Sequence, residues 1–335
     1  MKLSIVDVST VFPGETRHDA LINSIELAQF AEKLKYNRYW VAEHHAAFIA
    51  GRAPEVLIAA IAANTSTIRV GSGSVLLNHY SAFKVAEVFC TLNELYPGRI
   101  DLGAGRATTG PVTDYALQQD RTKQFHSDSN QQIVELVSWL ENNFPADHPF
   151  SQIPVFTIDN KPELLLLGSS PWSASAAASL GLRYVFAGFI NQAGAAEIIH
   201  SYRKKFKPSG GITGISKPEV SLSVHVVCAD TEEEASRQLA PVTQMYKNLS
   251  AGKLNDPNLS PDDAIIKLGG IPKIEKYIPG SMLPPKFIGG DPASVYDQLE
   301  NIAKDFSVDE LFIQDLITEK KARFRSYELL SKMIN

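Results

Sequence analysis

Cysteine is scarce in this sequence of 335 residues, which contains two, Cys90 and Cys228. The two are far apart, each lies within an apolar pattern, and neither has the spacing of a metal ligand. Disulfides are rare in the reducing cytosol, so a pair of isolated cysteines fits that compartment. We therefore expect two buried structural thiols, no metal site and a cytoplasmic protein.

Excess positive charge and long hydrophobic runs are also missing. The formal net charge is −5 and the pI about 5.9, so the chain lacks the basic footprint of a nucleic-acid-binding protein. No apolar run approaches the roughly 18–20 residues that span a bilayer. Asp7 interrupts the first apolar run too early for a signal peptide. We expect neither nucleic acid nor a membrane as a partner.

The sequence does contain a regular alternation of strand-like and helix-like segments. Residues 20–34 carry apolar side chains at helical spacing, and residues 38–42 are rich in β-branched and aromatic residues, as strands are. This alternation continues along the chain. Strands are predicted at 3–8, 38–42, 68–77, 99–102, 164–167, 184–187, 220–229 and 310–314, with a further short one at 155–158.

Eight principal strands separated by helices predict an α/β fold, a (β/α)8 TIM barrel formed by one domain over residues 1–335. The alternative is an open doubly wound sheet. Residues 8–18, after the first strand, lack the G-x-G-x-x-G motif of that fold. Residues 250–290 have no clear period and are rich in glycine and proline, so we expect a long insertion or lid there.

A barrel of this kind carries its active site at the carboxyl ends of its strands. Glu43, His44 and His45 follow the second strand, and histidine is suited to proton transfer near neutral pH. A metal site is disfavoured, because neighbouring residues on an extended segment point in opposite directions and no third ligand is evident. His44 is therefore a candidate catalytic residue, while for His45 a catalytic and a structural role both stay open.

Small residues follow three further strands. Residues 71–74 are Gly-Ser-Gly-Ser, which would admit a flat ligand or, alternatively, form a β-bulge. Residues 103–106 end in Gly105 and Arg106, whose planar fork suits phosphate; the alternative is a surface arginine in a loop. Residues 168–173 include Ser169, Ser170 and Ser173 at a helix start, which is an anion site or a plain N-cap.

As a set, these motifs resemble those of the bacterial luciferase-like flavin-dependent monooxygenases, in particular the single-chain luciferase-like oxidoreductases. The resemblance covers nearly the whole chain and is weakest over residues 250–283. The motifs that carry it are YWVAEHH at 39–45, RVGSGSVLL at 69–77, YPGRIDLGAGR at 96–106, LGSS at 167–170, AASLGL at 177–182, FIGGDP at 287–292 and VDEL at 308–311.

The resemblance implies a (β/α)8 barrel that uses reduced FMN and O2 to oxygenate a small organic substrate through a C4a-hydroperoxyflavin. It assigns the FMN phosphate to Arg106, Ser169, Ser170 and Ser173. It also implies a non-prolyl cis peptide bond between Gly73 and Ser74 beneath the isoalloxazine ring, and a catalytic role for His44. Luciferase has a reactive cysteine where this chain has Gly105, which argues against light emission.

No NAD(P)H-binding fingerprint is evident, so the flavin is expected to arrive reduced from a separate NAD(P)H:flavin reductase, in a two-component system. The family also implies a homodimer. Two alternatives stay open: a deazaflavin-dependent hydride-transfer oxidoreductase, and a non-catalytic flavin-binding barrel. The sequence does not name the substrate, whose pocket we expect to be lined by Phe12, Phe48, Tyr80 and Phe189.

Overall fold

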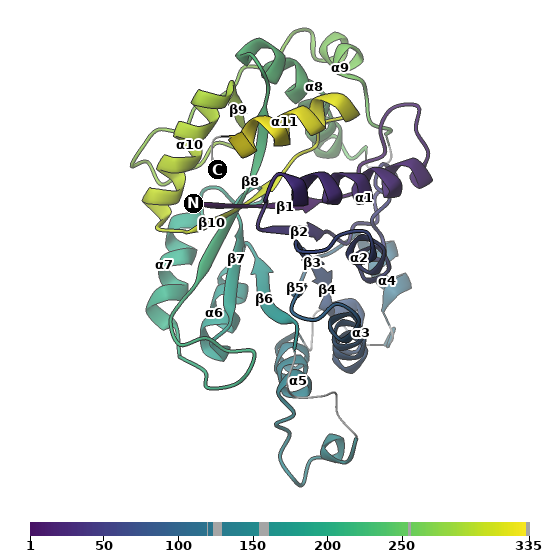
Figure 1. Ribbon diagram of the computed structural model, residues 1–335, viewed down its shortest axis with the longest axis vertical. Coiled ribbons are helices and arrows are strands. Elements are labelled where there is room, and N and C mark those ends of the chain that lie inside the picture. The colour runs from purple at the N-terminus through teal and green to yellow at the C-terminus, as the bar shows by residue number, and fades with distance from the viewer. Residues whose placement is uncertain (119, 123–128, 154–160, 254–255, 333–335) are drawn as a thin grey trace.

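Eight parallel strands close into a barrel in this computed structural model (Figure 1), which describes residues 1–118, 120–122, 129–153, 161–253 and 256–332. The strands are β1 (Lys2–Asp7), β2 (Arg38–Val41), β3 (Arg69–Ser72) with its continuation β4 (Val75–Leu76), β5 (Ile100–Gly105), β6 (Glu163–Gly168), β7 (Arg183–Ala187), β8 (Val220–Cys228) and β10 (Glu310–Gln314). Each pairs with the next in this order, and β10 pairs back to β1. The predicted (β/α)8 barrel is confirmed.

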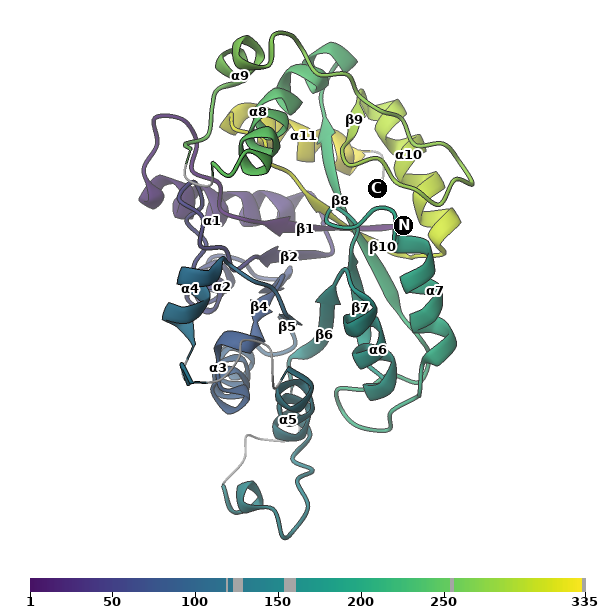
Figure 2. The ribbon, with the colours of Figure 1, turned by 180° about the vertical axis from the view of Figure 1, so that it is seen from behind.

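Helices surround the barrel on its outer side, as Figures 1 and 2 show. They are α1 (Arg17–Lys33), α2 (Pro54–Ala63), α3 (Ala82–Leu95), α4 (Pro111–Leu117), α5 (Ser129–Glu141), α6 (Pro171–Leu180), α7 (Ala195–Lys205), α8 (Glu232–Ser250), α10 (Pro292–Phe306) and α11 (Lys320–Lys332), with short 3₁₀ turns at Leu77–His79 and Pro149–Gln152. Capping side chains fix several starts: Thr16, Ser81 and Thr231 each accept a hydrogen bond from a first-turn N–H. None of the helices in the described ranges is long and apolar enough to cross a membrane.

Two strands differ from their predicted form. The third was predicted as one strand over 68–77, but a cis peptide bond between Gly73 and Ser74 divides it into β3 and β4. The fourth was predicted to end at residue 102, but β5 continues to Gly105. A side chain at Gly103 would overlap the Ser72 carbonyl, so glycine permits close strand approach here and does not end the strand. The strand predicted at 155–158 lies outside the described residues.

Cys90 and Cys228 are buried and free, as predicted. The barrel interior contains its own apolar cluster, separate from the larger core between strands and helices. Its central contact is between the rings of Trp40 and Phe312, whose centroids are 4.3 Å apart. We call this the inner cluster; it consists of Val6, Val8, Trp40, Ala42, Ile49, Leu165, Val185 and Phe312.

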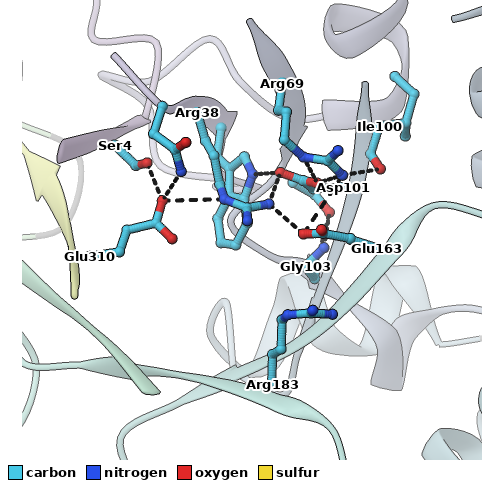
Figure 3. Close-up of polar contacts among 12 residues, drawn as sticks. Ser4, Arg38, Arg69, Ile100, Asp101, Gly103, Glu163, Arg183 and Glu310 are labelled. Atoms are coloured by element: carbon cyan, nitrogen blue, oxygen red, sulfur yellow. Dashed lines mark hydrogen bonds and ion pairs between the residues drawn. The ribbon is translucent and has the colours of Figure 1, made fainter. Parts of the chain in front are cut away.

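Ion pairs fill the barrel at the amino ends of its strands (Figure 3). Arg38 contacts Asp101 at 2.8 Å, Glu163 at 2.6 Å and Glu310 at 3.2 Å. Asp101 is fully buried and also accepts a hydrogen bond from the Trp40 indole N–H at 2.8 Å. Its carboxylate further pairs with Arg69. Because charged side chains occupy this end, the opposite, carboxyl end is the one that can admit a ligand.

The segment predicted as an insertion, residues 250–290, contains regular structure in its described part. It includes α9 (Pro261–Leu268), which packs on α8, and the short strand β9 (Ile288–Gly290), which pairs with the last three residues of β8. The Asn258 amide donates to the carbonyl of Val11 at 2.9 Å. Since Val11 follows β1, this segment reaches the carboxyl end of the barrel, which we call the mouth.

Candidate active site

Glu43, two residues after the end of β2, links two neighbouring strand ends. Its carboxylate is buried and accepts hydrogen bonds from the Leu76 N–H at 2.8 Å and the Tyr80 hydroxyl at 2.7 Å. His45 Nε2 lies 3.1 Å from the same carboxylate, which gives His45 a structural partner. Glu43 thus holds the chain that follows the cis bond against the end of β2. The sequence prediction considered this glutamate only as a metal ligand.

His44 lies at the mouth, where its side chain is accessible to solvent although protein surrounds it on most sides. Its backbone N–H donates to the Gly51 carbonyl at 2.9 Å. Desolvation lowers the pKa of His44 and neighbouring His45 lowers it further, while Glu43 opposes both. The lowered pKa favours the neutral imidazole, which can accept a proton. Within the described ranges, no group of three or more potential metal-ligating side chains is found.

The cis bond between Gly73 and Ser74 lies next to Glu43, the residue that precedes His44. The Gly73 N–H donates to the Val41 carbonyl at 2.9 Å, and the Ser74 carbonyl accepts from the Glu43 N–H at 3.3 Å. A side-chain carbon at position 73 would be 3.1 Å from the ring of Trp40. The backbone therefore lies closely over the Trp40 indole. Gly73 and Ser74 are both half-buried at the mouth.

Arg106 follows β5 and stacks on Trp172 of α6. Its guanidinium carbon lies 4.1 Å from the centroid of the Trp172 ring, a cation–π arrangement. Desolvation lowers the pKa of Arg106, and no carboxylate among the described residues is paired with it. A side chain at the preceding Gly105 would overlap the Ser74 hydroxyl. Position 105 therefore has no room for the luciferase cysteine unless Ser74 moves.

The three candidate serines near α6 differ in their surroundings. Ser170 is the N-cap and forms a capping box with Ser173. Ser173 is buried, and its hydroxyl donates to the Ser170 carbonyl at 2.8 Å and lies 3.0 Å from the Tyr184 hydroxyl. That hydroxyl is thus engaged within the fold, and Ser173 acts through the cap. Ser169 is half-buried, and its carbonyl accepts from Asn191 at 3.0 Å.

A small pocket opens beside Arg106, between the mouth and the start of α6. Its lining includes Leu77, Asn78, Gly105, Arg106 and Trp172. The structure therefore brings together Arg106 and the N-terminus of α6, and separately Glu43, the residue before His44, and the cis bond. Trp172 lies within the segment 168–173 that was predicted as an anion site or N-cap, but only its contact with Arg106 reveals its role.

The four aromatic residues predicted to line a substrate pocket lie in different settings. Phe12 is buried, and Phe48 packs on the inner cluster. Tyr80 is half-buried and held by Glu43. Phe189 lies against the ring of His225, a residue that the sequence prediction did not single out.

The arrangement of a histidine, a cis bond and an arginine around one barrel mouth agrees with the sequence comparison. The profile of the luciferase-like monooxygenase family matches residues 1–310. This chain is a luciferase-like monooxygenase family member. The N-acetyl-S-alkylcysteine monooxygenase of Bacillus subtilis (strain 168) is 35% identical to it, over 100% of this chain and 98% of that protein.

Solved structures extend the likeness of this luciferase-like monooxygenase. Apo-MsnO8 has a TM-score of 0.87 and 39% identity, covering 99% of this chain and 98% of that one. More distant structures share the fold alone. One is the oxygenating constituent of 3,6-diketocamphane monooxygenase from Pseudomonas putida in complex with FMN, with a TM-score of 0.71 and 19% identity, covering 99% of this chain and 97% of that one. Another is an F420-dependent secondary alcohol dehydrogenase, with a TM-score of 0.66 and 14% identity, covering 100% of this chain and 99% of that one.

Proposed function

We propose that this protein is a flavin-dependent monooxygenase that uses reduced FMN and O2 to oxygenate a small organic substrate. The observation that carries the proposal is the pairing of two features at one mouth. One is an arginine without an acid partner among the described residues, stacked beside a helix N-terminus. The other is the Gly73–Ser74 cis backbone beside Glu43, the residue that precedes His44. The first suits a phosphate tail and the second a flat ring.

Arg106 is the proposed main ligand of the FMN phosphate. Backbone N–H groups at the start of α6 and the hydroxyls of Ser169 and Ser170 add donors of the kind that bind anions at helix N-termini. Ser173 contributes by fixing the cap that orients these groups. An Arg–phosphate hydrogen bond is charge-assisted and contributes about 1.5–3 kcal/mol.

The ring of the cofactor is proposed to lie on Gly73 and Ser74. Gly105 leaves room for the Ser74 side chain, and Trp40 supports Gly73 from below. Reduced FMN would supply the activation of O2 at this position. His44, with its lowered pKa, is the proposed proton acceptor or donor beside the ring.

The partners of the reaction are part of the same proposal. A separate NAD(P)H:flavin reductase would supply reduced FMN in the cytoplasm, since the chain has no dinucleotide fingerprint after its first strand. A homodimer is proposed from the family resemblance. The related N-acetyl-S-alkylcysteine monooxygenase makes thioethers of N-acetylcysteine the first compounds to assay as substrates.

Anaerobic titration with FMN, photoreduced FMN and F420 tests the cofactor. We expect reduced FMN to bind, and Arg106→Ala to weaken its binding about 10- to 150-fold, the equivalent of the lost charge-assisted bond. Arg17→Ala is the matched control, because Arg17 is exposed at the start of α1. Preferential binding of F420, or unchanged FMN binding by Arg106→Ala, contradicts the proposal. His44→Ala should retain flavin binding and lose oxygenation.

A further inference from the structure

A buried histidine, His225, faces the barrel interior on β8. Alternate residues of this strand, Leu222, Val224 and Val226, belong to the outer core, so His225 points the other way. It is aligned with Gln314 of β10, while Ser223 is aligned with Phe312 of the inner cluster. His225 therefore lies one layer closer to the mouth than Phe312.

Aromatic rings from three other segments enclose His225. Its ring is 5.0 Å from that of Phe189, after β7, and 5.3 Å from that of Phe287, before β9, measured between centroids. Its Nε2 lies 3.2 Å from the hydroxyl of Tyr246 on α8. We call these four side chains (Phe189, His225, Tyr246 and Phe287) the aromatic cluster.

His225 is held as a neutral donor and acceptor within this cluster. Burial lowers the pKa of His225 to about 4, against a main-chain hydrogen bond to Gln314 that raises it. Because one ring N–H of His225 donates to the main-chain carbonyl of Gln314, the other ring nitrogen, Nε2, is left to accept from the Tyr246 hydroxyl. Neutral His225 thereby fixes the ring of Tyr246 without adding a charge to the cluster.

Lys286 places a positive charge on the aromatic cluster. Its ammonium lies 3.4 Å from the centroid of the Tyr246 ring and 5.8 Å from that of Phe287. No carboxylate among the described residues forms an ion pair with it, and desolvation alone lowers its pKa. The ring face satisfies one side of the ammonium, and the exposed side is available to an anion.

We propose that the aromatic cluster and Lys286 form the substrate subsite, with Lys286 binding the carboxylate of an organic acid and the rings packing on its apolar part. This inference rests on the proposed function, because it places the substrate of that reaction. A single ammonium among rings suits a monoanion with an apolar body. Phosphate is better matched by a planar arginine fork or several N–H donors, which this cluster does not offer.

The test measures binding without turnover, by calorimetry on the full chain. The probes are N-acetyl-S-benzylcysteine, benzoate and decanoate, each with its methyl ester, which lacks the charge and adds one methyl group. We expect at least one acid to bind about five- to tenfold more tightly than its ester. Lys286→Met, which keeps the alkyl stem, should remove this preference by weakening the acid and not the ester. Lys286→Arg should restore it.

Three results overturn the inference: none of the acids binds at millimolar concentration, acid and ester bind equally, or Lys286→Met weakens both to the same extent. Because the readout needs neither flavin nor O2, it is independent of the FMN titration with Arg106→Ala. If the natural protein binds no flavin but still binds an acid more tightly than its ester, only the proposed function is refuted. If turnover is observed, Lys286→Met should raise KM for the acid while kcat changes little.

Discussion

Replacing Glu43 tests whether one carboxylate maintains the geometry of the mouth. Glu43→Ala would leave the buried N–H of Leu76 and the hydroxyl of Tyr80 without their acceptor. An unsatisfied buried donor costs about 1–3 kcal/mol, so we expect the two groups and the small cavity to lower the free energy of unfolding by about 3–5 kcal/mol. Glu43→Gln retains one acceptor oxygen in nearly the same volume, so its cost should be about 1–2 kcal/mol.

Urea unfolding and reduced-FMN binding together measure this effect. Tyr80→Phe is the matched control, because it removes a single bond to Glu43 and should cost about 0.5–1.5 kcal/mol. Since Leu76 is two residues from Ser74, Glu43→Ala should also weaken flavin binding more than Tyr80→Phe does. Equal unfolding free energies for Glu43→Ala and the natural protein would refute the role assigned to this carboxylate.

Two further predictions concern Gly105 and His225. Gly105→Ala should weaken reduced-FMN binding and lower stability, because the added carbon overlaps the Ser74 hydroxyl; Gly210→Ala, with open space around it, should have no effect in the same titration. The pKa of His225 is about 4, below its ordinary 6.5, so the unfolded state binds more protons between these values and stability falls as pH drops. Between pH 7.5 and 5.5 we expect this one group to lower the free energy of unfolding by about 1 kcal/mol. In urea unfolding, the stability of His225→Gln should therefore depend less steeply on pH, and an unchanged slope would contradict the prediction.

The barrel was predictable because its signals are local. Periodicities of two and 3.6 residues, with glycine and serine at strand ends, are properties of short windows. The break in the third strand was not visible in that way: the sequence GSGS fits a continuous strand. The cis bond at Gly73 and Ser74 entered only through the family resemblance.

The site was predictable only where its residues were neighbours in sequence. Arg106 and the serines of α6 stand out locally, but the partners of Glu43 lie 33 and 37 residues away. From the sequence, the hydroxyl of Ser173 looked available for phosphate. Its contact with Tyr184 could not be foreseen, because it depends on the pairing of β6 and β7. The aromatic cluster draws on four separate segments, and no single window contains its pattern.

The pairing of β9 with β8 allows the chain between these two strands to vary in length without disturbing the barrel. The excursion that starts with α8, just after β8 ends, comes back to Val226–Cys228 through β9, so both of its ends are anchored at one strand terminus. Such a stretch can be lengthened or grafted at low entropic cost, about 0.6 kcal/mol for each doubling of a loop, without shifting the register of the barrel. Tyr246 and Lys286 belong to this excursion, whereas His44 and Arg106 do not. Two members of the proposed substrate subsite can therefore vary without disturbing the residues proposed to hold the flavin.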